Sequence, residues 1–282
     1  MHTLLLSSGW FVLEVFAAAA AAGLLGSLSG LGGGVLIVPA LTVGLGMDFR
    51  HAVGASIVAV IATSSGAAAS YVRDHLTNLR VGVLLELATS LGAFTGALLA
   101  PHLHTRMLFA LFGVALLASV VPAAWKLNEE LPQAVTPDRL SVRLRLGSTY
   151  PDHATGRLVS YQVTRVPAGL GMMYVAGVIS GLLGIGSGAL KVLAMDTAMR
   201  LPMKVSTATS NFMIGVTAAA SAGLYFWRGD VVPLVAGPVA LGALSGAVVG
   251  ARWLNRFSNR AVRSIFLPLL VLVALQMLAR GL

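Results

Sequence analysis

Long apolar runs separated by short polar segments dominate the chain. Because a helix needs about 20 residues to cross a bilayer, a nearly uncharged run of this length predicts a transmembrane helix. Six such runs cover 52–72, 81–101, 107–125, 205–227, 231–251 and 264–279. The pattern therefore predicts an all-α polytopic membrane protein.

Two further apolar runs, 9–45 and 167–199, are longer and contain glycine clusters. The clusters are SGLGGG at 29–34 and GLLGIGSG at 181–188. Each run predicts a discontinuous helix or a helical hairpin, because glycine lowers helix stability. The apolar start of the chain also resembles a signal peptide, but it lacks a basic first segment and contains Glu14. We interpret it as part of the first broken helix.

Residues 126–166 form the only long polar segment. Apolar and polar residues alternate in LSVRLRL (140–146) and in GRLVSYQV (156–163), on either side of a stretch that contains Gly, Pro and Asp. Alternation with a period of two is typical of strands. The segment therefore predicts a small β-hairpin outside the membrane.

The two halves of the chain match each other at a constant offset of 154 residues without a gap. The matched positions in the first half are Gly23, Gly30, Gly32, Gly34, Leu36, Val38, Ser56, Thr63, Tyr71, Gly92, Gly96 and Arg106. Composition rich in Gly and Ala raises chance matches, but an ungapped register through both glycine clusters favours a duplication. We predict a first membrane repeat at 1–125, a cytosolic linker at 126–166 and a second repeat at 167–282.

The overall composition supports a membrane protein and excludes other classes. Hydrophobic residues make up 57% of the chain and charged residues 10%, and the mean hydropathy is +0.86. A net charge of +9 would suggest nucleic acid for a soluble protein, but 18 of the 19 basic residues lie between apolar runs, so we expect no nucleic-acid partner. The absence of cysteine excludes disulfides and thiolate chemistry.

The distribution of Lys and Arg predicts the orientation of the repeats. If each glycine-broken run is a hairpin, fourteen basic residues of the connecting segments lie on one side and four on the other. The cytoplasmic side carries the excess of basic loop residues. We therefore predict inverted repeats, each with a broken hairpin plus three helices, in the cell (inner) membrane with both termini outside.

The glycine clusters are the first candidate for an anion site. Unwound backbone within a membrane is tolerated where it lines a cavity or is buried in protein, and the ends of half-helices hold ions in inverted-repeat transporters. The candidate residues are Gly32, Gly33, Gly34, Gly186, Ser187 and Gly188. The alternative is a pair of tight turns that let helices approach closely.

Lys191 is the only basic residue well inside an apolar run. A cation at that depth is expensive and usually faces a cavity or a partner. It predicts the positive charge of an anion site, and its repeat counterpart is Ile37, so only one half carries it. Alternatively, Lys191 reaches the headgroups or pairs with Asp196.

Small polar residues follow both broken runs. Hydroxyl and amide donors suit the oxygens of an oxyanion, which makes Ser56, Thr209, Ser210 and Asn211 further candidates. Serine and threonine in membrane helices also bond their own backbone or a neighbouring helix. Glu14 and Glu86 are acids within helical runs, and both become candidates for proton coupling if they face the interior.

Cofactor, metal and catalytic motifs were considered for the same residues. Neither glycine cluster satisfies a nucleotide-binding pattern, and the histidines lack metal-ligand spacing, so we expect no cofactor and no metal. Ser187 and Lys191 stand four residues apart and could form a serine–lysine hydrolase dyad.

The two glycine-containing segments and the small-residue helices after them resemble a known family. GLLGSLSGLGGGVLIVPAL with HAVGASIVAVIATSSGA, and GVISGLLGIGSGALKV with PMKVSTATSNFMIGVTAAAS, are similar to the repeats of the TauE/SafE sulfite-exporter-like permeases (TSUP). The resemblance implies transport of sulfite, thiosulfate, sulfoacetate or related organosulfonates. This chain departs from the usual pattern at Ser187, where glycine is common.

The sequence thus predicts a secondary transporter of small sulfur-containing anions that works by alternating access. Its partners would be the anion and the lipid bilayer. A serine–lysine hydrolase within the membrane and a passive anion channel are the alternatives.

Overall fold

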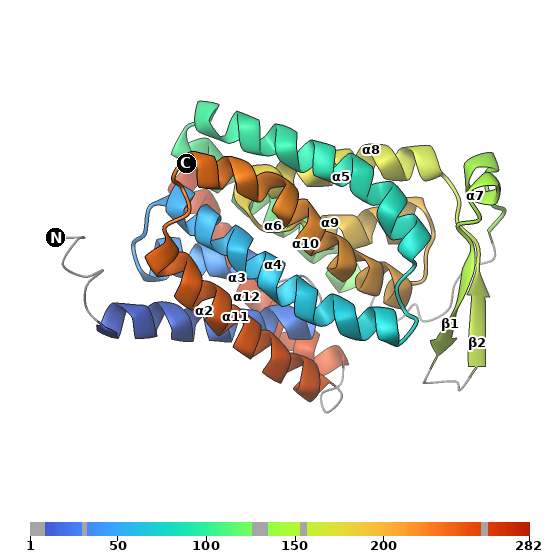
Figure 1. Ribbon diagram of the computed structural model, residues 1–282, viewed down its shortest axis with the longest axis horizontal. Helices are drawn as coiled ribbons and strands as arrows, with labels where there is room; N and C mark the ends of the chain where they lie inside the picture. Colours follow the sequence, from blue (N-terminus) through green and yellow to red (C-terminus); the bar gives the residue numbers. More distant parts are fainter. Residues whose placement is uncertain (1–8, 30–32, 126–134, 153–156, 255–258) are drawn as a thin grey trace.

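The protein is an elongated helical bundle with a small hairpin at one end (Figure 1). The computed structural model describes residues 9–29, 33–125, 135–152, 157–254 and 259–282. In the first half, the order is α2 (Gly9–Ser29), α3 (Gly34–Pro39), the π-helix η1 (Ala40–Gly44), α4 (Phe49–Arg73), α5 (Leu79–Leu99), the 3₁₀-helix η2 (Ala100–His102) and α6 (Thr105–Trp125). The second half contains α8 (Val166–Leu183), α9 (Gly188–Leu193), the π-helix η3 (Ala194–Ala198), α10 (Met203–Trp227), α11 (Pro233–Leu254) and α12 (Asn259–Gly281).

The linker between the halves contains α7 (Arg139–Arg143) and the antiparallel strands β1 (Ser148–Asp152) and β2 (Arg157–Tyr161). The prediction of a strand at 140–146 is wrong, because Asp138 caps a helical turn there by accepting a hydrogen bond from the Ser141 backbone N–H at 2.7 Å. The other carboxylate oxygen of Asp138 accepts from the Val166 backbone N–H, 2.8 Å away, at the start of α8. The local cap therefore outweighs the alternating pattern.

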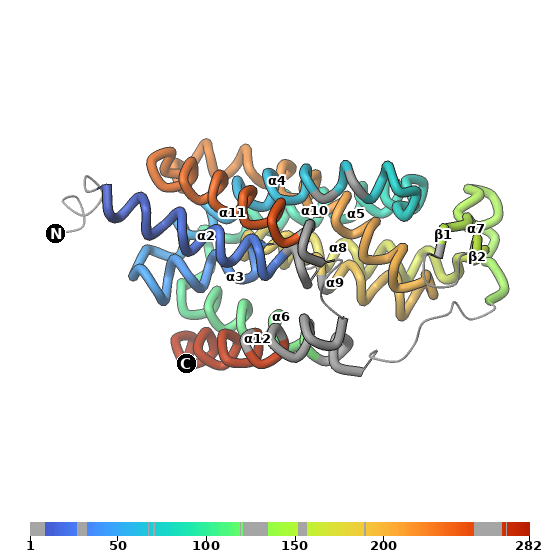
Figure 2. Tube along the Cα trace, turned by 90° about the horizontal axis from the view of Figure 1, so that it is seen from below, coloured from blue at the N-terminus to red at the C-terminus, as the bar shows by residue number. Residues whose placement is uncertain are grey.

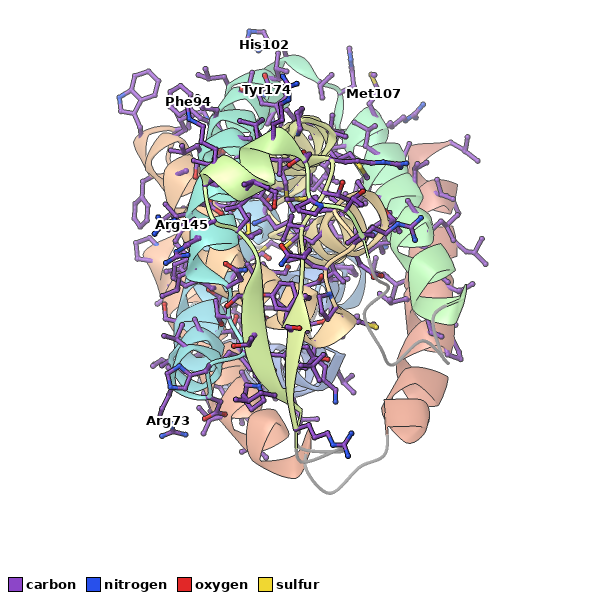
Figure 3. All side chains as sticks on the ribbon, turned by 90° about the vertical axis from the view of Figure 1, so that its right-hand side faces the viewer. Arg73, Phe94, His102, Met107, Arg145 and Tyr174 are labelled. Atoms are coloured by element: carbon purple, nitrogen blue, oxygen red, sulfur yellow. The ribbon has the colours of Figure 1, made fainter. Side chains whose placement is uncertain are left out.

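The hairpin is fixed to the membrane helices through Asn78. Its side-chain amide donates to the Leu146 carbonyl and to the Tyr161 hydroxyl, both at 2.8 Å. Its carbonyl oxygen caps α5 by accepting from the Val81 backbone N–H at 3.1 Å. Burial raises the pKa of Tyr161, so its hydroxyl stays protonated in this contact. Figure 3 looks onto this end, where the strands cross the helix ends and Arg73 and Arg145 are exposed.

The helices of the two halves follow the predicted register. Adding 154 to the bounds of α3, η1 and α4 gives those of α9, η3 and α10. The halves interleave: α2 packs on α11, α5 packs on α8, and α4 packs on its counterpart α10. The pair α6 and α12, also counterparts, lies in a separate layer (Figure 2). Neither half is therefore a separate packing unit.

Each glycine-broken run is a hairpin that enters and leaves at the same end of the bundle. In the second half, the Thr164 backbone N–H just before α8 donates to the Met199 carbonyl just after η3, at 3.2 Å. In the first half, α2 begins and η1 ends at the opposite end, where Arg280 donates to the Thr42 carbonyl at 3.1 Å. The start of α2 and the end of α12 thus lie at the same end of the bundle, away from the β-hairpin (Figure 1).

Small residues allow the closest helix contacts. A Cβ at Gly92 or Gly96 of α5 would collide with the backbone of α8, and one at Gly242 or Gly246 of α11 would collide with the backbone of α2. Helices that lack a hydrophobic force between them gain contact in this way. These glycines therefore form the packing faces of α5 and α11.

Length and composition support membrane insertion of the bundle. Among the described residues, five helices are long and apolar enough to cross a bilayer, at Gly9–Gly26, Phe49–Arg73, Leu79–His102, Val166–Leu183 and Pro233–Gly250. Trp10 and Trp227, 76% and 84% exposed, lie at the same end of the bundle, as aromatic residues do at a membrane interface. The helix α10 is less apolar because it carries buried polar residues, among them Ser206, Thr209 and Ser210.

Candidate functional site

The two glycine breaks meet inside the bundle. A Cβ placed on Gly34 would lie 3.1 Å from the carbonyl oxygen of Gly184 and 3.0 Å from Ser56 Oγ. Ser56, on α4, donates its hydroxyl to the Gly184 carbonyl at 2.9 Å and lies 3.4 Å from the Gly34 carbonyl. We call this contact between Gly33–Gly34 and Gly184–Gly188 the break junction. It is buried and joins the two halves.

The second break has an unusual backbone. Gly184 and Gly186 have φ values of 65° and 71°, and Ser187 has a φ of 48°. A side chain is rarely tolerated at a positive φ, so Ser187 holds a costly conformation. Its hydroxyl oxygen is buried without a hydrogen-bond partner among the described residues. A buried hydroxyl of this kind can be completed by a water molecule or a ligand.

Lys191 lies one turn into α9 and its side chain is fully buried. Its ammonium group donates to Thr217 Oγ1 on α10 at 2.5 Å, and that hydroxyl donates to Glu86 Oε1 on α5 at 2.7 Å. Ser90 donates to the same carboxylate oxygen at 2.8 Å, while the other oxygen, Oε2, is buried and has no partner among the described residues. We call Lys191, Thr217, Glu86 and Ser90 the lysine relay. Lys191 therefore neither reaches a headgroup nor stands alone.

The remaining predicted polar residues are bound to backbone or lie elsewhere. Ser210 donates to the Gly188 carbonyl at 3.0 Å, which repeats the contact of Ser56 with Gly34. Asn211 donates to the Thr207 carbonyl of its own helix at 3.0 Å. Thr209 accepts from the Asn78 backbone N–H at 3.0 Å and thus faces α5 rather than the break junction.

The described site does not include two of the predicted residues. Gly32 falls outside the described residues, whereas its neighbours Gly33 and Gly34 are buried. Glu14 is exposed on the surface of α2, so its carboxylate does not face the interior.

Sequence reasoning missed Thr217 and Ser90. The spacing of Glu86 and Ser90, four residues apart on one helix, signals a shared face. Thr217 was visible only as the repeat counterpart of Thr63. Its contact with Lys191 depends on how α9 and α10 pack, which no local pattern encodes.

Ser187 and Lys191 do not form the predicted hydrolase dyad. Lys191 donates to Thr217 rather than to Ser187, whose hydroxyl has no partner in the described part of the chain. A general base must lie within hydrogen-bond reach of the nucleophile. The described residues also contain no cluster of His, Asp and Glu that could hold a metal ion.

The chain matches the family "Sulfite exporter TauE/SafE" over residues 15–277. It belongs to this family. Among its relatives, a probable membrane transporter protein of Bacillus subtilis (strain 168), YunE, is 26% identical over 267 residues, which cover 92% of this chain and 94% of that protein. A second from Sinorhizobium, ORF9, is 25% identical over 266 residues, covering 94% and 90%. No solved structure matches the chain.

Family and relatives identify this TauE/SafE member as a multi-pass membrane transporter. A transporter of polar solutes needs a polar binding site within the bilayer. The break junction and the lysine relay place buried polar groups inside this bundle, and both lie between the two halves.

Proposed function

We propose that the protein carries small sulfur-containing anions, such as sulfite, thiosulfate, sulfoacetate and related organosulfonates, by alternating access. The observation that supports this most directly is the unpartnered hydroxyl of Ser187, buried at the break junction one turn from Lys191. An oxyanion would accept from this hydroxyl and from the lysine ammonium. Charge-assisted hydrogen bonds of this type are stronger than neutral ones.

The lysine relay explains how such a site stays stable without its anion. A lone ammonium group buried in the bundle would be costly, but Glu86 compensates it through Thr217. An arriving anion has to compete with Glu86 for Lys191. Binding is therefore favoured when Glu86 takes up a proton, because the relay then carries a net positive charge that the anion neutralises.

Proton-coupled transport follows from this competition. One proton on Glu86 offsets one negative charge of the substrate, so the loaded site is as neutral as the empty one for a monoanion and carries one net negative charge for a dianion such as thiosulfate. Glu86 has the contacts for this role, since one of its carboxylate oxygens is bonded to Ser90 and Thr217 while the other is free within the described structure. Glu14 was a second candidate, and its exposed position on α2 offers it no comparable partner.

The inverted arrangement of the repeats belongs to the same proposal. Two counterpart pairs run antiparallel: Gly113 of α6 lies against Ala274 of α12 while Gly281 lies against Ala110, and α4 meets α10 with Ser64 against Gly215 and Gly54 against Asp230, just beyond α10. Antiparallel counterparts support repeats of opposite orientation. We place the β-hairpin in the cytosol and both termini outside the inner membrane.

A binding screen with the purified protein tests the substrate class. Thermal unfolding would be followed with sulfite, thiosulfate, sulfoacetate and taurine, because a ligand of the folded state raises its stability with occupancy. We expect sulfite, thiosulfate or sulfoacetate to raise the melting temperature. Stabilisation by none of them, or only by neutral solutes, would contradict the proposal. Flux into proteoliposomes then separates a carrier, which saturates, from a channel.

A further inference from the structure

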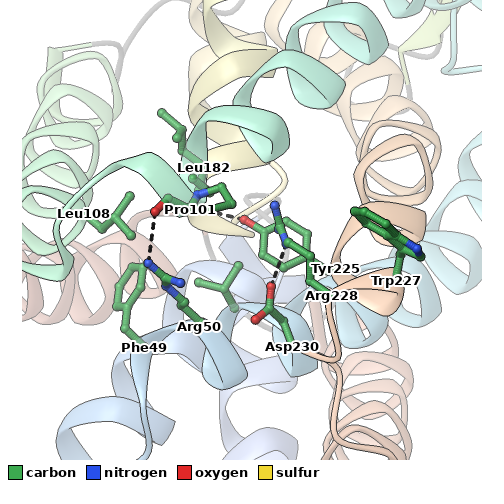
Figure 4. A pocket seen from close by; sticks show the side chains of 11 residues that line it. Phe49, Arg50, Pro101, Leu108, Leu182, Tyr225, Trp227, Arg228 and Asp230 are labelled. Carbon is green, nitrogen blue, oxygen red and sulfur yellow. Dashed lines mark hydrogen bonds and ion pairs between the residues drawn. The ribbon is translucent and has the colours of Figure 1, made fainter.

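A cavity of about 410 Å³ lies at the end of the bundle that contains both ends of the described chain. Its wall includes Phe49 and Arg50 at the start of α4, and Tyr225, Trp227 and Arg228 at the end of α10 (Figure 4). None of these residues belongs to the break junction or to the lysine relay. Cavities of this size hold small organic ligands.

The charges of the cavity wall do not balance. Its charged residues are Arg50, Arg228 and Asp230. Asp230 pairs with Arg228 at 3.0 Å, and the Arg228 guanidinium also donates to the Ala97 carbonyl at 2.6 Å and covers the Tyr225 ring at 4.4 Å. Arg228 is thus held in place and neutralised.

Arg50 supplies the remaining positive charge. Its side chain is exposed, and its guanidinium donates to the Pro101 carbonyl at 3.3 Å. Among the described residues, no carboxylate lies within ion-pair distance of this guanidinium. An arginine presents several donors in a planar fork, so the others can bind a carboxylate or sulfonate group.

The rest of the wall is apolar or aromatic. Phe49, Leu108, Leu182 and the ring of Tyr225 line the cavity beside Arg50. A bare inorganic ion would leave this surface uncovered, whereas the carbon chain of an organic anion would cover it. The lining therefore favours an anion with one acidic group and a short apolar part.

The floor of the cavity leads to the break junction. Val53 and Leu182 line it, and Val53 contacts Gly184, since a Cβ on Gly184 would lie 2.7 Å from Val53 Cγ1. Tyr225 donates its hydroxyl to the Gly181 carbonyl in the last turn of α8 at 2.7 Å. The cavity thus adjoins the second break and is separated from it by apolar side chains.

We propose that this cavity is a second binding site, an outer vestibule in which Arg50 captures a short organic sulfonate or carboxylate before it reaches the break junction. The assignment of the cavity to the transport path rests on the proposed function. The binding of an organic anion at Arg50 can be tested without transport.

Site-directed labelling tests the vestibule, because the natural chain has no cysteine. Pro101→Cys places a thiol on the wall and keeps the carbonyl that Arg50 contacts. Anionic and cationic methanethiosulfonate reagents of matched length would be compared, with butanesulfonate and sulfate as protecting probes. Arg50→Gln in this background removes the charge. Arg106→Gln is the matched control, an exposed arginine at the same end that does not line the cavity.

We expect the anionic reagent to react faster than the cationic one. Arg50→Gln should lower the ratio of the anionic to the cationic reaction rate about tenfold, as loss of one charged hydrogen bond would. Butanesulfonate should protect the thiol in the Pro101→Cys parent and in Arg106→Gln but not in Arg50→Gln. Equal anionic-to-cationic rate ratios in Arg50→Gln and Arg106→Gln would show that Arg50 does not bind anions in this cavity. Protection by sulfate at the same concentrations as butanesulfonate would overturn the preference for an organic anion.

The same labelling separates this inference from the proposed function. Protection should persist when the lysine relay is neutralised by Lys191→Met with Glu86→Gln, because the vestibule does not include it. If protection persists there but the unsubstituted protein transports no sulfur anion, the proposed function fails and the vestibule stands. If the unsubstituted protein transports these anions and butanesulfonate does not protect, the vestibule alone fails.

Discussion

The positive charge of Lys191 is fully buried. Its hydrogen bond to Thr217 links this charge to Glu86. The sequence alone predicts a buried cation here, because a lysine within an apolar run has few other roles. It does not predict Glu86 as the partner, because that contact depends on the crossing of α5 and α10. Asp196, the nearest acid in sequence, was the partner that the sequence suggested.

Substitution of Lys191 should separate stability from binding. Lys191→Met leaves Glu86 buried without its cation, so we expect the protein to lose about 3–5 kcal/mol of folding stability. Adding Glu86→Gln should restore most of this loss, because a neutral relay needs no countercharge. Both variants should lose anion binding, and Lys191→Arg should keep the charge but fit poorly because guanidinium is larger and planar. Thermal unfolding and anion titration measure the two effects; anion binding by the double variant as tight as in the natural protein would exclude Lys191 as a ligand.

Glu86 alone tests the coupling. Glu86→Gln removes the carboxylate that competes for Lys191 and keeps a hydrogen-bonding side chain, so anion binding should no longer be accompanied by proton uptake. The natural protein should take up a proton with the anion. Proton uptake measured in weakly buffered solution during a thiosulfate titration provides the comparison, and unchanged uptake in the variant would assign the coupling to another group.

A methyl group at Gly34 should disturb the break junction. The added Cβ would lie 2.5 Å from Val60 Cγ2 and 3.0 Å from Ser56 Oγ, so we expect Gly34→Ala to cost about 1–3 kcal/mol and to reduce transport. Gly44→Ala is the control in the same hairpin, because nothing lies within 4 Å of its added Cβ. Uptake rates and unfolding temperatures should differ between the two; equal rates would show that the junction tolerates expansion.

The sequence predicts the long helices but not the short helix α7 or the π-helices. The length of the uncharged runs identifies the transmembrane helices, because a helix must be this long and apolar to cross a bilayer. The glycine clusters identify both breaks. The strand predicted at 140–146 became the turn α7, because the cap by Asp138 acts within one turn while alternation needs a partner strand. The π-helices η1 and η3 at matching positions carry no pattern that reveals them.

The contact of α5 with α8 gives a prediction for one whole interface. A Cβ on Gly181 would collide with the Ala93 backbone, so Gly181→Ala should push the helices apart and destabilise the protein by about 1–3 kcal/mol. Gly171→Ala, on the same helix, meets nothing within 4 Å and should be neutral or slightly stabilising. Thermal unfolding compares them, and an equally small effect of both would contradict close packing at this interface.

For the whole molecule, orientation is the first property to test. Leu282 is 96% exposed at the end of α12 and Leu158 is 75% exposed in β2, at opposite ends of the bundle (Figure 1). Leu282→Cys and Leu158→Cys should label from opposite sides of the membrane, with Leu282→Cys outside as the basic asymmetry predicts. Impermeant thiol reagents on intact cells measure this. Labelling of both from one side would contradict an odd number of crossings in the second half.

Counterflow in proteoliposomes tests the central claim most directly, namely that a carrier site built on Ser187 and Lys191 binds a sulfur-containing anion. Vesicles loaded with unlabelled thiosulfate or sulfoacetate would receive the labelled anion outside. We predict transient, saturable accumulation of label with the natural protein, and none with the double variant Lys191→Met, Glu86→Gln, which should keep its fold. Equal accumulation by both proteins, or flux that does not saturate, would contradict the account.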